Sequence, residues 1–428
     1  MNNFNVRLKS RYELLVDYLI IALMVLYISG ASAITKSHLF VLFSFSVLCL
    51  IFVVRKRHID VPFLLFLAIW CFINLISSLV NDLSTFSLPF FLNETGRMIM
   101  AYLMIKIVGP SLFNKFSKFT FPLIVLSLFL FAFQLLGESI FHSLAPKLNF
   151  LTQELQKQAG GWSLFVYTFN AFAVDRNSGF MWEPGAYAAI LIFFLYYRLF
   201  INNFKVDTKV IIILIALFTT FSTAGYLALS VFIICYFTYH RKAIFPILLL
   251  PFAIMYGIYY YHSADFLNDK IERYIDIGTE SWEEESVDGE RYMRMSRLGV
   301  FVASVEGAIY RPLGSGVLAN KHTIEKYGSE YGPNFLAKVL QQWGWLGILF
   351  FYYALYKFTR RWCNSQLMTY SFLLSMSIVL FSNPFTFRYL MFCIVFFPFI
   401  SENRYMEYYF NYKIKYIERV KKKNCLHF

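Results

Sequence analysis

The sequence predicts an all-α polytopic membrane protein with about twelve transmembrane helices and a large external loop that contains helices of its own. Of the 428 residues, 58% are hydrophobic and only 15% are charged, whereas a soluble domain carries about 25% charged residues. The mean hydropathy is +0.54. The apolar residues lie in continuous runs, which suit membrane-spanning helices and exclude the alternating strands of an outer-membrane barrel.

The apolar runs divide the chain into five parts. Residues 1–12 form the N-terminus, 13–262 carry nine spans, 263–333 form the largest external loop, 334–400 carry three further spans, and 401–428 form a basic tail. A second external loop is expected at about 138–181. Continuous apolarity places the spans near 13–35, 38–54, 61–80, 97–110, 119–137, 181–201, 210–221, 224–240, 243–262, 334–356, 367–383 and 385–400.

The positive charges predict the orientation of these spans. The chain has a net charge of +13, and most of its 39 Lys and Arg residues fall at alternate span ends and in the C-terminal tail. The positive-inside rule then places both termini in the cytoplasm and the two long loops outside. We therefore expect the basic tail to contact anionic lipid headgroups rather than nucleic acid.

A compact polar motif precedes the expected span 181–201. It runs from Asp175 to Tyr187 as DRNSGFMWEPGAY. Pro184 suits the first turn of a helix, which places Glu183 at the helix cap. A carboxylate at the membrane boundary near Arg176 is a candidate for acid–base chemistry. The alternative is that Glu183 is simply a cap stabilised by the helix dipole.

Within the largest loop, an acidic run at 265–290 is followed by arginines. We expect residues 291–310 to form one helix, in which Arg291, Arg294 and Arg297 share one face. Arginines in a row suit a phosphate or diphosphate because each planar fork donates two hydrogen bonds. The alternative is that they neutralise the acidic run.

The apolar run 210–239 is interrupted by TTFSTAG at 219–225, which predicts two helices that meet at a tight external turn. The small residues of this turn either face the outer vestibule or permit close helix packing. Few charges fall inside the expected spans. Asp17 and Lys106 are two of them, and we expect both to reach water at span ends.

Several motifs, in this order, resemble those of the bacterial O-antigen polymerase (Wzy-type) family and of the wider superfamily of O-antigen ligases and capsule polymerases. The motif at 176–185 carries the resemblance. The break at 221–225 is similar to the family's Ser-Arg-x-Gly, with Thr223 in place of Arg. Residues 311–316, RPLGSG, resemble its Pro-Leu-x-Gly-x-Gly turn. The segment from Asn334 to Gly347 resembles its His-Asn-x-Leu segment and the glycines that follow.

This resemblance implies a GT-C-like fold and a glycosyltransferase of the bacterial inner membrane that acts on the periplasmic face. Its substrates would be undecaprenyl-diphosphate-linked oligosaccharides, and a protein that regulates chain length would be a further partner besides membrane lipids. The chemistry would need no metal and no cofactor, because arginines can stabilise the leaving diphosphate. Pro333 stands where the family has His, and His322 is the nearest histidine. The candidate catalytic residues are Glu183 and Arg176, and the candidate substrate-binding residues are Arg291, Arg294, Arg297, Arg311, His322 and Asn334.

Two other functions stay open. An O-antigen ligase would share the fold, and the Glu-Pro-Gly form of the motif at 183–185 favours the polymerase. A transporter or flippase of lipid-linked sugar would show internal repeats or helices broken at mid-membrane. The halves of this sequence show no such similarity, and its polar residues gather toward the outer face.

Overall fold

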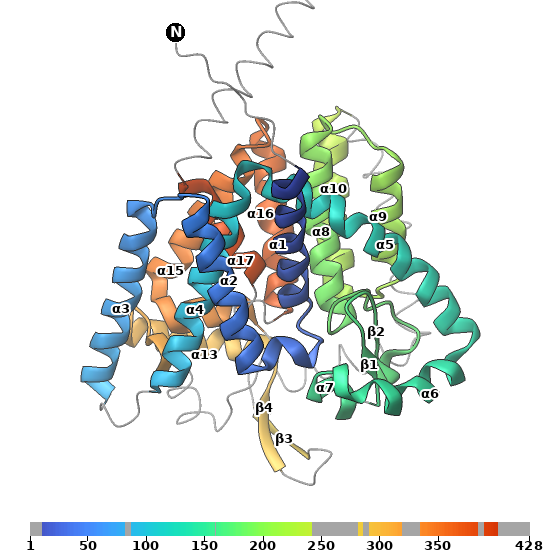
Figure 1. The fold of residues 1–428 in the computed structure, drawn as a ribbon, viewed down its shortest axis with the longest axis horizontal. Helices are drawn as coiled ribbons and strands as arrows, with labels where there is room; N and C mark the ends of the chain where they lie inside the picture. The colour runs from blue at the N-terminus through green and yellow to red at the C-terminus, as the bar shows by residue number, and fades with distance from the viewer. Residues whose placement is uncertain are drawn as a thin grey trace, which may run out of the picture.

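The computed structural model describes residues 11–81, 87–241 except 159, 281–285, 291–318, 334–383 and 389–400; for 81, 155, 281–285, 291–295 and 318 only the backbone is described. Within these ranges the protein is mostly helical, with two short β-hairpins (Figure 1). Four helical stretches are long and apolar enough to cross a membrane: Arg11–Ser29, Val61–Val80, Leu88–Leu136 and Pro184–Ile201.

The first half of the bundle consists of five helices. They are α1 (Arg11–Ser29), α2 (His38–Val54), α3 (Val61–Asn81), α4 (Leu88–Val108) and α5 (Leu112–Leu136). The second half contains α8 (Pro184–Ile201), α9 (Thr208–Phe218), α10 (Thr223–Tyr239), α15 (Phe335–Arg360), α16 (Gln366–Phe381) and α17 (Tyr389–Phe396). Single 3₁₀ turns occur at Ala33–Lys36, Gly109–Ser111, Asn149–Leu151, Ala171–Ala173, Gly316–Leu318 and Phe397–Phe399.

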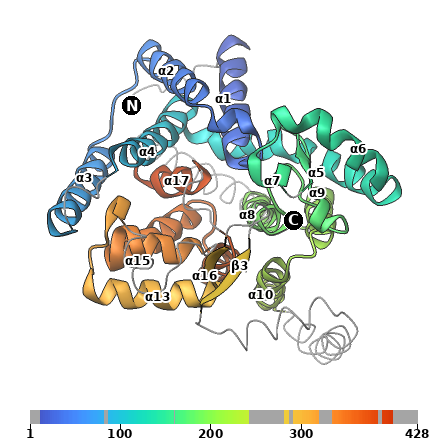
Figure 2. The same cartoon turned by 90° about the horizontal axis from the view of Figure 1, so that it is seen from below.

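Helix α8 lies at the centre of the bundle, as Figure 2 shows. In α8, 83% of the residues of the apolar stretch are buried inside the protein, compared with 33% in α3 at the edge. A helix that is apolar all round belongs in such an interior position. Because α8 begins at Pro184, the polar motif before it is held at the middle of one end of the bundle.

The extramembrane elements gather at that same end (Figure 1). They are α6 (Glu138–Leu148), α7 (Glu154–Gln158), the hairpin of β1 (Trp162–Ser163) and β2 (Thr168–Phe169), the hairpin of β3 (Ser281–Glu285) and β4 (Arg291–Met295), and α13 (Arg297–Tyr310). Both hairpins are antiparallel, with Trp162 opposite Phe169 and Ser281 opposite Met295. Helix α6 and the first hairpin share a small core of their own around Phe141, Trp162 and Tyr167.

The helices follow the expected spans closely, and α2 coincides with the predicted 38–54. The expected span 243–262 lies outside the described residues. Two expectations are wrong. Helix α4 begins at Leu88 rather than near 97. Residues 291–310 do not form one helix, because 291–295 pair as strand β4 and helix α13 begins at Arg297.

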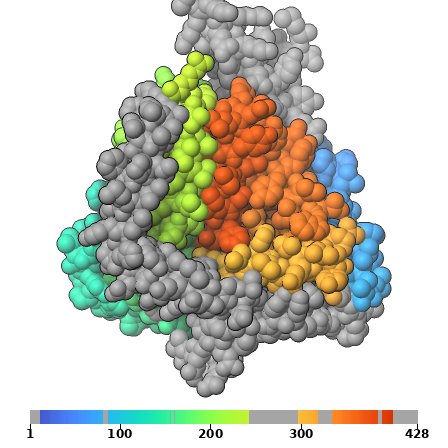
Figure 3. Space-filling model, turned by 180° about the vertical axis from the view of Figure 1, so that it is seen from behind, coloured from blue at the N-terminus to red at the C-terminus, as the bar shows by residue number. Residues whose placement is uncertain are grey.

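Helix α15 departs most from a simple span. Gly344 has φ +62° and ψ −158°, which breaks the helix into two segments. In a straight helix Phe335 and Phe351 would be roughly 24 Å apart, yet their ring centroids are 5.0 Å apart. The first segment therefore folds back sharply across the end of the bundle. Helix α13 crosses the bundle alongside it, and in Figure 3 residues 297–318 extend toward α3.

The charged residues inside the helices are paired rather than exposed to water, so the expectation for Asp17 and Lys106 is wrong. Asp17 is completely buried and accepts hydrogen bonds from Arg55 at 2.6 Å and from Lys115. Lys106 lies 3.1 Å from the carboxylate of Asp60. Burial of such charges is tolerated because each one has a partner of opposite sign.

Candidate functional site

The loop that carries Arg176 is bound to the break between α9 and α10. The Nε of Arg176 donates to the Thr220 carbonyl at 3.1 Å. The Asn177 N–H donates to the Thr219 carbonyl at 2.8 Å, and the Asn177 amide donates to the Thr219 hydroxyl at 3.0 Å. Two of the motifs singled out in the sequence thus contact each other directly. Helix α9 ends at Phe218, so the carbonyls of Thr219 and Thr220 are not used within the helix and can accept from this loop.

Gly179 is required for the turn between Arg176 and Glu183. It has φ +52°, and an added Cβ would lie 2.5 Å from the ring of Tyr187. Its N–H is held by the Asn177 side chain at 2.8 Å, and its carbonyl accepts from Thr168 of β2 at 2.7 Å. The turn brings the chain back toward α8, as the spacing of the motif predicts.

Glu183 occupies the N-cap position of α8 with extended φ −154° and ψ 158°. Within the described part of the chain, its carboxylate caps none of the first amides of α8, so the simple capping interpretation is not supported. The neighbouring Trp182 carbonyl accepts from Gln156 at 2.8 Å and from Asn170 at 3.3 Å. These bonds fix the peptide group between Trp182 and Glu183, and the Glu183 side chain is partly exposed.

Arg297 is the first residue of α13, and Asn334 holds it in place. Ser296 caps α13 by accepting from the Gly299 N–H at 2.9 Å. The fully buried Asn334 caps α15 by accepting from the Ala337 N–H at 3.0 Å, and its amide donates to the Arg297 carbonyl at 3.1 Å. Both halves of the Asn334 side chain are engaged. The structure thus gives Asn334 a positioning role between two helix starts.

Charges of both signs act on the Arg176 guanidinium, and they come from groups on different elements of the structure. Burial lowers the pKa of the Arg176 guanidinium, the carboxylates of Asp175 and Glu183 oppose this effect, and the charge of Arg297 adds to it. Arg176 and Arg297 are therefore near enough to repel each other, although they are separated by over a hundred residues in the sequence. Two guanidinium groups beside a carboxylate form a site that can hold a diphosphate and accept a proton.

Arg311 does not join this cluster. It ends α13, so it lies roughly 20 Å from Arg297 along the helix axis at about 1.5 Å per residue. There its guanidinium donates to the Ser315 hydroxyl at 3.3 Å. The RPLGSG turn binds the break in α15, because the Pro312 carbonyl accepts from the Trp345 N–H at 3.0 Å and the Ser315 N–H donates to Gln341 at 2.8 Å.

The same turn also binds α3. The Val317 N–H donates to the Asn74 side chain at 2.8 Å, and the Ser77 hydroxyl donates to the Ser315 carbonyl at 2.8 Å. An added Cβ at Gly316 would lie 2.3 Å from Asn74. The Pro-Leu-x-Gly-x-Gly turn therefore has a structural task, which is to join α13, α15 and α3.

The remaining candidates are placed only in part. Arg291 and Arg294 lie on strand β4, so they do not share a helical face with Arg297 as expected. Strand geometry alternates side chains between faces and cannot align residues three apart. The structure describes only the backbone of Arg291 and Arg294, and His322 lies outside the described residues.

Sequence reasoning missed a second charged group at the same end of the bundle. Glu94 of α4 is 1% exposed, bonds Arg97 at 2.7 Å, and lies within electrostatic range of Lys338 on the first segment of α15. The signal was present in the sequence, because Asn93, Glu94 and Arg97 interrupt an otherwise apolar stretch. The expected span begins near 97, so Asn93 and Glu94 fall before it, whereas the structure includes them in helix α4.

Among the described residues, no group of three or more His, Cys, Asp or Glu side chains is arranged to hold a metal ion. Comparisons of the chain with protein-family models, with curated proteins and with solved structures gave no match.

Proposed function

We propose that the protein is a polysaccharide polymerase of the bacterial inner membrane that joins undecaprenyl-diphosphate-linked oligosaccharide units on the periplasmic face. The observation that carries the proposal is the proximity of Arg176, Glu183 and Arg297. Arg176 and Glu183 belong to one motif that resembles those of O-antigen polymerases, and Arg297 comes from the row of arginines in the large loop. The Arg176–Thr220 bond joins the first motif to the break between α9 and α10, and the Asn334–Arg297 bond joins the family-like segment at Asn334 to the start of α13.

The proposed reaction uses these three side chains as follows. A hydroxyl oxygen of the acceptor sugar attacks the anomeric carbon of the donor chain, and the bond between that carbon and the diphosphate oxygen breaks. The hydroxyl proton passes to the Glu183 carboxylate. The electron pair leaves with the lipid diphosphate, whose growing charge Arg176 and Arg297 stabilise with charged hydrogen bonds.

The test is the lipopolysaccharide ladder of a strain that lacks the gene and is complemented with variants. Loss of the gene should leave a single repeat unit attached outside, and the wild-type gene should restore the ladder. Glu183→Gln keeps the shape and removes the charge, so it should abolish the ladder. Glu138→Gln, on the exposed start of α6, is the matched control and should leave the ladder intact.

The alanine and lysine variants of the two arginines should slow polymerisation to different extents. Loss of one charged hydrogen bond costs about 1.5–3 kcal/mol, which is roughly ten- to a hundredfold in rate. Arg297→Lys should recover only part of the activity because an ammonium group lacks the planar fork. A normal ladder from Glu183→Gln and from Arg176→Ala at matched expression would overturn the proposed chemistry.

A further inference from the structure

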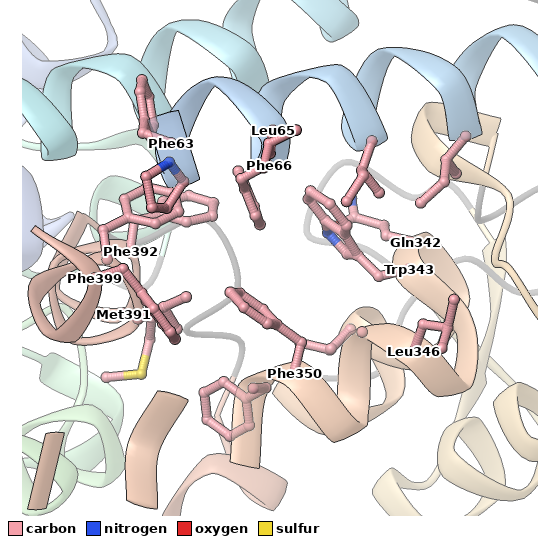
Figure 4. Close-up of a pocket in the computed structure, with 18 of the residues that line it drawn as sticks. Phe63, Leu65, Phe66, Gln342, Trp343, Leu346, Phe350, Met391, Phe392 and Phe399 are labelled. Atoms are coloured by element: carbon pink, nitrogen blue, oxygen red, sulfur yellow. The ribbon is translucent and has the colours of Figure 1, made fainter. Parts of the chain in front are cut away.

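A long apolar groove lies between α3, α15 and α17. Its volume is about 640 Å³, and aromatic rings form much of its wall, as Figure 4 shows for Phe63, Phe66, Trp343 and Phe350. Among the described lining residues, polar side chains are few, and Asp60 is already paired with Lys106. Such a lining offers almost no hydrogen bonds, so it does not suit a sugar. It suits a hydrocarbon chain.

The groove opens sideways, where lipid would surround the bundle. Leu65, Ile69, Phe72 and Leu346 line it and are each more than half exposed, with exposed fractions of 59%, 54%, 56% and 58%. Large exposed apolar residues on adjacent helices mark a surface in contact with the hydrocarbon phase. A molecule that occupies the groove can therefore come from the membrane itself.

The inner end of the groove reaches the candidate site. Phe335 lines the groove, and it is the first residue of the α15 segment that folds back at Gly344. The adjacent Asn334 donates to the Arg297 carbonyl at 3.1 Å. The groove thus extends from an opening at the edge of the bundle to Phe335, which is adjacent to Asn334. The first segment of α15 covers this part of the groove.

We propose that this groove holds the hydrocarbon chain of a polyprenyl diphosphate substrate, with the diphosphate directed toward Arg297 and Arg176. This inference rests on the proposed function and adds the place where the lipid binds. The chemistry of the two ends selects the occupant: an apolar chain at one end and an anion able to occupy two guanidinium groups at the other. A phospholipid offers only a phosphodiester to the same pair.

The groove contributes orientation rather than affinity. A chain that moves from lipid into the groove exchanges one hydrocarbon environment for another, so it gains no hydrophobic free energy. What the aromatic wall supplies is a fixed direction for the chain, which holds the diphosphate at the reacting position. Obstruction of the groove should therefore lower kcat for long-chain donors and leave short-chain donors nearly unaffected.

The test places a photo-crosslinking amino acid, p-benzoylphenylalanine, at Leu346 in the full-length protein. The matched control carries it at Leu349, three residues away on α15, which is 66% exposed and lies outside the described lining of the groove. The probe is radiolabelled undecaprenyl diphosphate in vesicles of phosphatidylglycerol and phosphatidylethanolamine. We expect at least tenfold more adduct at 346 than at 349, reduced by unlabelled undecaprenyl diphosphate and unchanged by added phosphatidylglycerol.

Equal labelling at both positions, or loss of the adduct on addition of phosphatidylglycerol, would overturn the inference. The first result would mean that the surface only contacts bulk lipid, and the second that a phospholipid occupies the groove. Labelling requires no turnover. If the protein shows no polymerase activity but is strongly labelled at 346, the proposed reaction is rejected and the assignment of the groove to the lipid chain is kept. Leu346→Trp, with Leu349→Trp as its control, should lower kcat about tenfold for the undecaprenyl donor only.

Discussion

Substitution of Gly344 by alanine tests the break in α15 without any assumption about activity. The backbone at this position has φ +62° and ψ −158°, a region that glycine alone adopts without strain of about 1–3 kcal/mol. An added Cβ would also lie 1.9 Å from the Pro312 carbonyl. The RPLGSG turn would have to move away from α15 to make room.

The cost follows from the contacts that the movement breaks. The bonds from Trp345 to Pro312, at 3.0 Å, and from Ser315 to Gln341, at 2.8 Å, would be lost or lengthened, at about 1 kcal/mol each. With the backbone strain, we expect Gly344→Ala to destabilise the protein by about 3–5 kcal/mol. The midpoint of thermal unfolding in detergent should fall by roughly 3–6 °C for a chain of 428 residues.

Gly96→Ala is the matched control, because Gly96 lies within α4 and an added Cβ there meets nothing within 4 Å. Alanine in place of glycine in a helix stabilises by about 0.5–1 kcal/mol. The control midpoint should stay the same or rise slightly. If Gly344→Ala unfolds at the wild-type temperature, α15 is not broken at this residue, and the fold-back that forms the roof of the groove is wrong.

Three further predictions concern other parts of the molecule. Asn334→Ala should lower stability by about 2 kcal/mol, since it loses both a helix cap and a second hydrogen bond. Asn334→Asp keeps the cap but buries an unpaired carboxylate oxygen against the Arg297 carbonyl, so it should be at least as destabilising in the same unfolding assay. Partial burial acts to raise the pKa of Asp207, but hydrogen bonds and the charge of Arg198 hold this pKa below its usual value. The Asp207–Arg198 pair therefore stabilises the folded protein by up to about 1 kcal/mol above pH ~4. This contribution disappears as the pH falls through the lowered pKa. Asp207→Asn should remove that step from the pH dependence of the unfolding midpoint, and an unchanged step would contradict the assignment. Reporter fusions at Arg57 and Gln156 should report the cytoplasm and the exterior respectively, and an exterior signal at Arg57 would reverse the topology.

Continuous apolarity was enough to predict most of the bundle, because a helix in lipid needs little more than length and hydrophobicity. The prediction from apolarity failed where a polar side chain has a partner that only the tertiary structure supplies. Helix α4 begins at Leu88, after the Ser87 cap, and it can include Glu94 because this residue is paired with Arg97 and lies near Lys338. The break at Gly344 was also missed, since it depends on the Pro312 turn that docks against it.

The candidate site was predictable in its parts but not in its assembly. Arg176, Glu183 and Arg297 were each singled out from local motifs, and their proximity depends on how α8, α10 and α13 pack. The periodicity argument for Arg291 and Arg294 failed because residues 291–295 pair with Ser281–Glu285 as a hairpin. An i, i+3 spacing is compatible with a helix, but pairing with the preceding strand overrides it.

The buried contact of Asp17 with Arg55 and Lys115 has a consequence for biogenesis. A lone carboxylate in an apolar helix costs up to about 2.5–3.5 kcal/mol at the bilayer centre. Arg55 follows Asp17 by 38 residues and Lys115 by 98. During synthesis α1 can therefore leave the translocon as a neutral pair with the end of α2, before α5 exists. The extra positive charge of Lys115 then favours insertion of α5 only beside this pair, which sets an order of assembly for the N-terminal helices.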